Sequence, residues 1–137
     1  MLRLPVLAWL RLARVFQKID RRQSITLRGY GLNTAQFDVL AQVGSHGGIT
    51  QQELADKLLV TKGNVSQLLD RMEKLGLLRR CQEQRSNSLL LTEKGLEFYQ
   101  RVIPAHEKSI EELLAGLSSA ETAELLRILR KLDHSLI

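Results

Sequence analysis

The sequence is poor in several residue types that mark other classes of protein. It holds one cysteine, Cys81, which excludes an internal disulfide framework and favours a reducing cytoplasm. Only 4% of its 137 residues are aromatic and two are proline, which suits a helical protein of one domain. No apolar run approaches the roughly 18 residues that a membrane-spanning helix needs. We therefore expect a cytoplasmic protein with no membrane partner.

Signals of catalysis and of metal binding are also missing. There is no glycine-rich phosphate loop, no nucleophile with a base at suggestive spacing, and no carboxylate pair on a cleft-forming element. His46, His106 and His134 are far apart, and none forms a close pair with another histidine or with the cysteine. We therefore expect no enzyme, no cofactor and no metal site.

Positive charge is concentrated in the first two thirds of the chain. The net charge is +5, but residues 1–91 hold 14 Lys or Arg against 7 Asp or Glu, whereas residues 92–137 hold 6 against 8. A surface that binds phosphates needs such a local excess. Many soluble proteins are mildly basic, so charge alone leaves nucleic-acid binding open.

The stretch from Thr50 to Thr92 has the pattern of two short helices and a hairpin. Thr50 and Glu53 form a predicted capping box, in which each side chain accepts from the other residue's backbone N–H. Two apolar stripes follow at helical spacing, separated by the turn at residues 60–63. The first stripe is Leu54, Ala55 and Leu58, and the second is Val65, Leu68, Leu69 and Met72. This pattern predicts a helix-turn-helix, whose second helix enters the DNA major groove.

A short basic hairpin is predicted after the second helix, which ends at Gly76. Residues 77–80 and 88–91 are the two strand candidates, and the polar residues from Gln82 to Asn87 form the tip between them. Thr92 then caps the next helix.

Longer helices are predicted on both sides of this core. A first helix covers about residues 5–29, and a second starts at the capping pair Asn33-Thr34 and stops at residues 44–48. The helix after the hairpin carries apolar residues at heptad spacing, and Pro104 should kink it without ending it. This seam is Leu96, Tyr99, Ile103, His106, Ile110, Leu113 and Leu117. A capping box from Ser118 to Glu121 starts a final amphipathic helix.

The two terminal segments carry more apolar surface than one small core can cover. The amino terminus alone adds Leu2, Leu4, Val6, Leu7, Trp9 and Leu10. Burial of this surface points to a second subunit, and a two-fold dimer would set two recognition helices roughly 34 Å apart, one DNA turn. A monomer whose first and last helices pack on each other stays open as the alternative.

Five blocks of the sequence together resemble the MarR family of bacterial transcription regulators. They are Leu32–Leu40, Thr50–Ala55, Val65–Glu73, Gly76–Arg79 and Leu91–Gly95, and the resemblance covers essentially the whole chain. It implies a mainly α, winged helix-turn-helix homodimer that binds a palindromic operator in double-stranded DNA, usually as a repressor, in the cytoplasm of a bacterium or archaeon. Within a single domain, 1–137, residues 32–92 would be the DNA-binding lobe, and residues 1–31 and 93–137 the dimerisation helices.

The resemblance also implies which element reads DNA, because in this family the fourth helix enters the major groove. Gln67 can read adenine with two hydrogen bonds, and Lys62 can reach guanine or a phosphate. Gly63 lets the helix approach the DNA backbone, and Thr50-Gln51 at a helix start can donate to a phosphate. Arg71 touches phosphate or pairs with Asp70 or Glu73. The predicted DNA-binding residues are Thr50, Gln51, Thr61, Lys62, Gly63, Asn64, Ser66, Gln67, Arg71 and Arg85.

The wing, which enters the minor groove in this family, departs from the family pattern. Asp-Arg-Arg usually stands nine, eight and seven residues before the threonine that is Thr92 here. This chain has Glu83, Gln84 and Arg85 instead. Arg85 is therefore the predicted minor-groove residue, where a cation meets enhanced negative potential. The neutral Gln84 should weaken the wing's contribution.

A small aromatic or phenolic acid is the effector that the resemblance implies, bound between the dimer helices and the DNA-binding lobe. Trp9, Phe16, Tyr30 and Phe37 are candidates to line that pocket, but each is equally suited to a core.

Two alternatives depend on single features. Cys81 could be a redox switch, but it falls on the first predicted wing strand with no second cysteine to resolve a sulfenic acid, so a packed strand cysteine is favoured. The rival function is a helical module that uses the winged fold to bind protein without DNA. Such a module should expose apolar residues where this sequence has a polar and basic recognition face.

Overall fold

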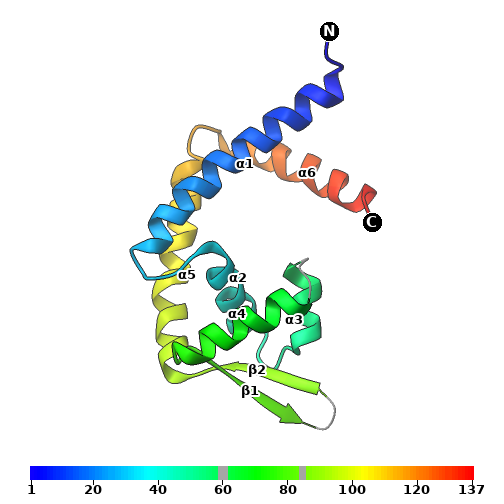
Figure 1. Ribbon diagram of the computed structural model, residues 1–137. Coiled ribbons are helices and arrows are strands. Elements are labelled where there is room, and N and C mark those ends of the chain that lie inside the picture. Colours follow the sequence, from blue (N-terminus) through cyan, green and yellow to red (C-terminus); the bar gives the residue numbers. More distant parts are fainter. Residues whose placement is uncertain (59–61, 84–85) are drawn as a thin grey trace. The chain divides into compact units, whose positions relative to one another are not determined.

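The computed structural model describes residues 1–58, 62–83 and 86–137, which form six helices and one antiparallel hairpin (Figure 1). The helices are α1 (Leu4–Arg28), α2 (Thr34–Ser45), α3 (Gln51–Leu58), α4 (Lys62–Lys74), α5 (Glu93–Leu113) and α6 (Ser119–Ser135), and the strands are β1 (Leu78–Glu83) and β2 (Ser86–Leu91). The predicted fold class is confirmed, since the α3–α4 helix pair is followed directly by a two-stranded wing.

The chain divides into two compact units, Met1–His106 and Glu107–Ile137. The first unit holds α1 to α4, the wing and most of α5, and the second holds the end of α5 and α6. Helix α5 runs through Pro104 without ending, as the apolar pattern on both sides predicts. The division of labour between a DNA-binding lobe and dimerisation helices stays a prediction.

Reciprocal capping boxes fix the start of three helices. In each box the cap side chain accepts from the backbone N–H three residues later, and that residue's side chain accepts from the cap N–H. The pairs are Asn33–Gln36, Thr50–Glu53 and Ser118–Glu121, with donor–acceptor distances from 2.8 to 3.2 Å. The starts predicted for α2, α3 and α6 are therefore confirmed.

The buried core lies in the first unit, where α2, α3 and α4 meet the base of the wing. Both predicted helix-turn-helix stripes point into it, although Leu58 and Leu68 are only partly buried. The fully inward residues are Leu54, Ala55, Val65, Leu69 and Met72, none more than 3% exposed. Burial of these side chains supplies most of the free energy that holds the two helices together.

Gly76 ends α4 as predicted. Its φ of +77° is in the left-handed region, where glycine carries no Cβ penalty. Its N–H donates to the Glu73 carbonyl at 2.9 Å, and the Leu77 N–H donates to the Met72 carbonyl at 3.1 Å. This Schellman-type turn directs the chain straight from α4 into β1.

The segment before α3 is attached to the wing. Thr50 and Ser88 form an isolated antiparallel bridge, and the Leu89 N–H donates to the Ile49 carbonyl at 2.8 Å. Leu89 is fully buried beneath this contact. The wing is therefore held at the start of α3 as well as at the end of α4.

The hairpin prediction was wrong in one respect, the length of the tip. The strands extend to the facing pair Glu83 and Ser86, so most of the segment from Gln82 to Asn87 is paired. An antiparallel ladder is made by the backbone, so an exposed hairpin continues through polar residues. Positions 84 and 85 lie outside the described residues.

Two helix boundaries also differ from the prediction. Lys62 and Gly63 belong to α4 and not to the turn. The N–H groups of a helix's first turn have no intrahelical acceptor, so its residues carry a weaker helical signal than those further on. Leu117 was the last member of the predicted seam, but α5 ends at Leu113. A tight turn follows, in which the Leu117 N–H donates to the Leu114 carbonyl at 3.0 Å.

Candidate nucleic-acid interface

Helix α4 has one buried and one exposed side. Val65, Leu69 and Met72 have no exposed surface, and the 3.6-residue period sets Gln67 on the opposite side, where its side chain is exposed. Asn64 and Arg71 are exposed beside it, whereas Ser66 is half-buried on the flank that faces the wing. Three of the predicted DNA-binding side chains thus share the outer surface of α4.

The same three side chains border a hollow in the first unit. The cavity has a volume of about 450 Å³ and is lined by Ala35, Asp38, Leu58, Asn64, Gln67, Leu68 and Arg71, from α2, α3 and α4. Asp38 is exposed as a residue, but its carboxyl is partly desolvated. This desolvation, together with the negative charge of Asp20, raises the pKa of Asp38 above its usual value.

The start of α3 also carries predicted contacts. Thr50 and Gln51 are both half-buried there. The Thr50 hydroxyl oxygen accepts from the Glu53 N–H at 3.1 Å, and its O–H proton can still donate to another group. Lys62 and Gly63 lie in the first turn of α4. Thr61 and Arg85 lie outside the described residues.

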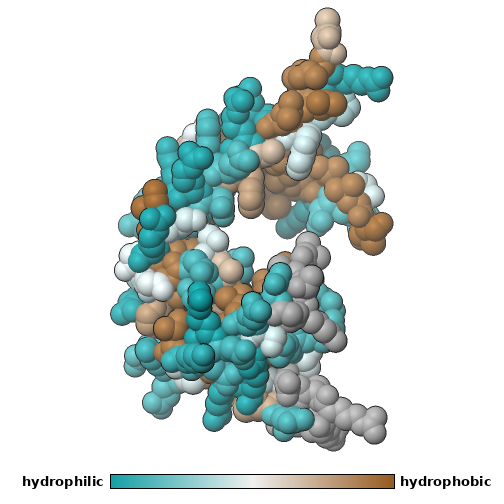
Figure 2. All heavy atoms as spheres, viewed as in Figure 1, coloured by the Kyte–Doolittle hydropathy of each residue, from teal (hydrophilic) through white to brown (hydrophobic). Residues whose placement is uncertain are grey.

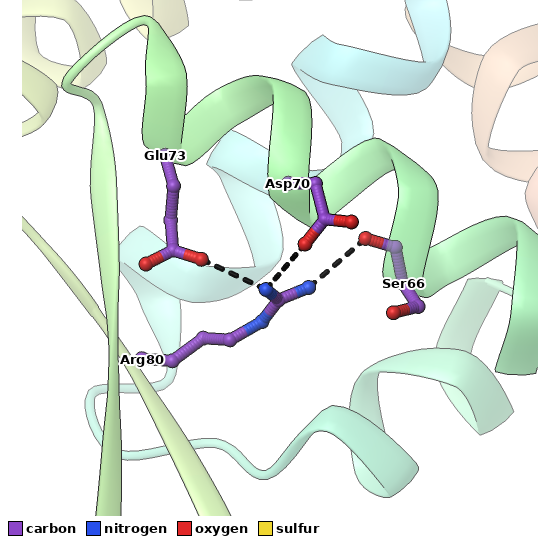
Figure 3. Close-up of polar contacts among 4 residues, drawn as sticks. All are labelled: Ser66, Asp70, Glu73 and Arg80. Carbon is purple, nitrogen blue, oxygen red and sulfur yellow. Dashed lines mark hydrogen bonds and ion pairs between the residues drawn. The ribbon is translucent and has the colours of Figure 1, made fainter.

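An arginine that the sequence analysis did not select connects the wing to α4. Arg80 of β1 donates from Nη1 to Asp70 Oδ1 at 2.6 Å and to Glu73 Oε1 at 2.8 Å, and from Nη2 to the Ser66 carbonyl at 2.9 Å (Figure 3). Asp70 and Glu73, the two carboxylates considered for Arg71, thus both accept from Arg80. The role of Arg71, on phosphate or on one of these carboxylates, stays a prediction.

The alternation of side chains between the two faces of β1 is the sequence signal that could have identified Arg80 as an inward-facing residue. Successive strand residues point to opposite faces, so Arg80 shares a face with Leu78, which is buried against the core. Asp70 and Glu73 are three residues apart on α4 and lie on one helical face. If the position of the hairpin on α4 had been known, the sequence would have predicted that Arg80 meets Asp70 and Glu73.

The four candidate effector residues have different surroundings. Phe37 is 7% exposed and stacks on His106 at 4.1 Å between ring centroids, and Tyr30 is half-buried with the Arg101 guanidinium 5.9 Å from its ring centroid. Trp9 and Phe16 of α1 are 62% and 65% exposed. None of the four lines the cavity described above, and their role stays a prediction.

Apolar side chains gather at the amino-terminal part of α1, where Figure 2 shows a hydrophobic cluster among hydrophilic residues. At least 37% of each of these side chains is exposed: Leu2, Leu4, Val6, Leu7, Trp9, Leu10, Leu12, Val15 and Phe16. In the second unit, α6 has no buried residue and exposes Leu126, Ile128 and Leu132, and Leu136 just after it is also exposed. Such large apolar patches mark interaction surfaces. Among the described helices, none is long and apolar enough to cross a membrane.

Cys81 is half-buried on β1 opposite Ser88. Across residues 1–58, 62–83 and 86–137 there is no group of three or more His, Cys, Asp or Glu that could hold a metal ion.

A helix-turn-helix with a polar outer face on its second helix and a wing bound to that helix defines a winged helix DNA-binding protein. The sequence profile of the MarR family matches residues 30–86. A helix-turn-helix transcriptional regulator of Bacillus cereus is 40% identical over 98 residues, covering 72% of this chain and 67% of its own. The regulator YkoM of Bacillus subtilis is 31% identical over 122 residues, covering 87% and 79%. The chain belongs to the MarR family, and it is a DNA-binding transcriptional regulator.

Solved structures give the same result. AbsC, a MarR family regulator from Streptomyces coelicolor, has a TM-score of 0.89 at 25% identity, over 99% of this chain and 97% of its own. A MarR family regulator from Listeria monocytogenes in complex with a 26-mer DNA has a TM-score of 0.83 at 26% identity, over 93% and 87%. The organohalide-sensing regulator RdhR with bound 2,4-dichlorophenol has a TM-score of 0.87 at 25% identity, over 98% and 82%.

Proposed function

We propose that this regulator is a homodimeric repressor that reads a palindromic operator with α4 and leaves it when a small aromatic or phenolic ligand binds. The observation that carries the proposal is the exposed polar face of α4, opposite a fully buried stripe and beside an attached wing. A protein-binding helix would instead expose apolar residues at these positions.

In this proposal the residues of α4 divide into readers and holders. Gln67 is the reader, because its amide can make two hydrogen bonds to adenine. Lys62 binds guanine or phosphate, Arg71 binds phosphate, and Asn64 and Ser66 are further partners. Thr50, Gln51 and Thr61 hold phosphates, Gly63 allows close approach, and Arg85 enters the minor groove from the wing.

The apolar surface of α1 and α6 supports the homodimer. A chain of 137 residues that exposes so many large aliphatic side chains gains by burying them against a second copy. A two-fold dimer then presents two recognition helices to two half-sites. This also explains why the operator should be palindromic.

The DNA test compares a selected site with its scrambled version. Genomic fragments bound by the purified protein are sequenced, and the shared site is titrated by fluorescence anisotropy alongside a scrambled duplex. Operator binding should be about a thousandfold tighter or more. Equal affinity for both duplexes would reject the proposal and favour the protein-interaction module.

The ligand test is a screen of phenols and aromatic acids for operator release. The bound dichlorophenol of RdhR supports this choice of compounds. Tyr30→Ala should abolish the response if the four aromatic residues form the site. Ala35→Phe should abolish it if the ligand uses the cavity between α2 and α4. Absence of release by any compound would contradict the effector part of the proposal alone.

A further inference from the structure

Arg80 contacts α4 at three points that span two turns of the helix. Its acceptors are the Ser66 carbonyl, the Asp70 carboxylate and the Glu73 carboxylate, at 2.9, 2.6 and 2.8 Å. Spacings of four and then three residues set them along one flank of α4. Figure 3 shows the guanidinium extending from β1 across to these three groups.

The two carboxylates of this cluster are open to water, whereas Arg80 is mostly buried. The side chains of Arg80, Asp70 and Glu73 are 22%, 56% and 36% exposed, and ion pairs in contact with water contribute little to folding. The Arg80 Nε is buried and has no hydrogen-bond partner among the described residues. The guanidinium nitrogens Nη1 and Nη2 therefore bind α4, whereas Nε donates to none of the described residues.

The geometry restrains two movements of the wing. Acceptors at positions 66, 70 and 73 oppose sliding of β1 along α4, because sliding would lengthen at least one contact. A planar guanidinium that binds on two of its nitrogens also resists rotation of the strand about the helix. Both movements would change where the wing stands relative to the outer face of α4, which carries Gln67.

We propose that Arg80 is a positioning residue for DNA recognition: it sets the register of the wing against α4, so that one operator satisfies both at once. This rests on the proposed function, because it assumes that α4 and the wing contact DNA together. Arg80 itself need not touch DNA. Its loss should therefore reduce the preference for operator more than the affinity for DNA in general.

The experiment measures operator and scrambled-duplex affinity, at several salt concentrations, for Arg80→Gln and Arg80→Lys. Arg80→Gln should lose about tenfold on operator and much less on the scrambled duplex, with little change in salt slope. Arg80→Lys keeps the charge but lacks the planar fork, so it should recover only part of the preference. Arg80→Lys also provides the comparison if Arg80→Gln does not fold. Thermal unfolding of the two variants shows whether each is folded.

Arg79→Gln is the matched control. Arg79 is the neighbouring residue, is exposed, and lies on the opposite face of β1. Its loss removes the same charge without touching the cluster, so the ratio of operator to scrambled affinity should stay close to that of the parent. A ratio lowered as far as in Arg80→Gln would mean that charge on β1, and not the cluster, is responsible.

The triple variant Asp70→Asn, Glu73→Gln, Arg80→Gln separates positioning from charge neutralisation. If Arg80 only shields two carboxylates from the DNA phosphates, the triple variant should regain the parent's operator affinity, and the positioning role is rejected. If Arg80 sets the register, the operator preference should stay reduced. A parent protein that does not distinguish operator from scrambled duplex would reject the proposed function instead.

Discussion

Gly95 of α5 lies so close to the Leu77 carbonyl that a Cβ at position 95 would overlap its oxygen. That carbonyl also accepts from the Thr92 N–H at 3.1 Å, and the Gly95 N–H donates to the Thr92 hydroxyl at 3.0 Å. The base of the wing and the first turn of α5 are therefore in direct backbone contact. This explains physically why the glycine of the Leu91–Gly95 block cannot carry a side chain.

Gly95→Ala should reduce the free energy of unfolding by about 3 kcal/mol, because the added methyl group meets backbone that cannot rotate away. Urea denaturation monitored by circular dichroism measures this loss. Gly116→Ala is the control, since nothing lies within 4 Å of a Cβ there, and it should change stability by less than about 0.5 kcal/mol. Equal effects of the two substitutions would show that the Leu77 contact is not tight.

Asp38→Asn should stabilise the protein at neutral pH. Desolvation, followed by the charge of Asp20, raises the pKa of Asp38 above 3.8. The folded state thus binds the proton more tightly than the unfolded state, so stability falls as the pH rises from the unfolded towards the folded pKa. Asparagine cannot ionise, so Asp38→Asn should remove this loss of folding stability. The stabilising effect should disappear below the pKa of Asp38 in the unfolded state, because aspartate is then protonated in both the folded and the unfolded protein.

Denaturation of parent and variant at neutral and at acid pH tests this expectation. Asp20→Asn is the companion variant, because it removes only the second cause and should stabilise less than Asp38→Asn. A benefit of Asp38→Asn that is equal at both pH values would point to packing and not to the ionised carboxylate.

Leu10→Glu should weaken dimerisation and operator binding together. Leu10 is 49% exposed on α1, so the charge should leave the fold of the single chain intact, while a dimer interface would have to bury it. Loss of one half-site lowers the affinity of the other through lost effective concentration. Light scattering should report a mass near one 15.6 kDa chain for the variant and twice that for the parent.

Leu75→Glu is the control for that experiment. Leu75 is 42% exposed just after α4, outside the terminal helices, and the substitution adds the same charge. This variant should stay dimeric. A parent that is monomeric at micromolar concentration would contradict the homodimer directly.

Local signals in the sequence were enough to predict the helix-turn-helix. The Thr50 capping box, the buried stripe through Leu69 and the glycine turn at Gly76 each depend on residues within one helix length. The family pattern then added the expected role of the hairpin as a wing for the minor groove. Strand length was not predictable in the same way, because an exposed ladder is made by backbone groups that every residue carries.

Contacts between elements were the part that the sequence left open. Arg80 is ten residues from Asp70 and seven from Glu73 in the chain, and only the placement of β1 on α4 brings them within 2.8 Å. The same holds for Phe37, whose stacking on His106 puts it in the core of the first unit. Periodicity marked Phe37 and His106 as apolar-face residues but could not pair them, and it did not mark Arg80.

Substitutions at Gln67 and Arg85 should separate reading of a base from attraction to phosphates. Gln67 is exposed opposite the buried stripe, so Gln67→Ala should leave stability unchanged. It should cost about 1–3 kcal/mol on operator and relax the preference at one position in each half-site, because the amide is lost as a partner for adenine. The salt slope should stay as in the parent, since a neutral side chain displaces no counterion.

Arg85→Ala should weaken binding in a different way. A cation in the minor groove releases counterions, so its loss should lower the salt dependence of both operator and scrambled binding, with the larger part of the effect independent of sequence. Anisotropy titrations at four or more salt concentrations on both duplexes distinguish the two variants. If both bind operator like the parent with unchanged slopes, α4 and the wing do not have these roles, and the protein-interaction reading of the winged fold would be preferred.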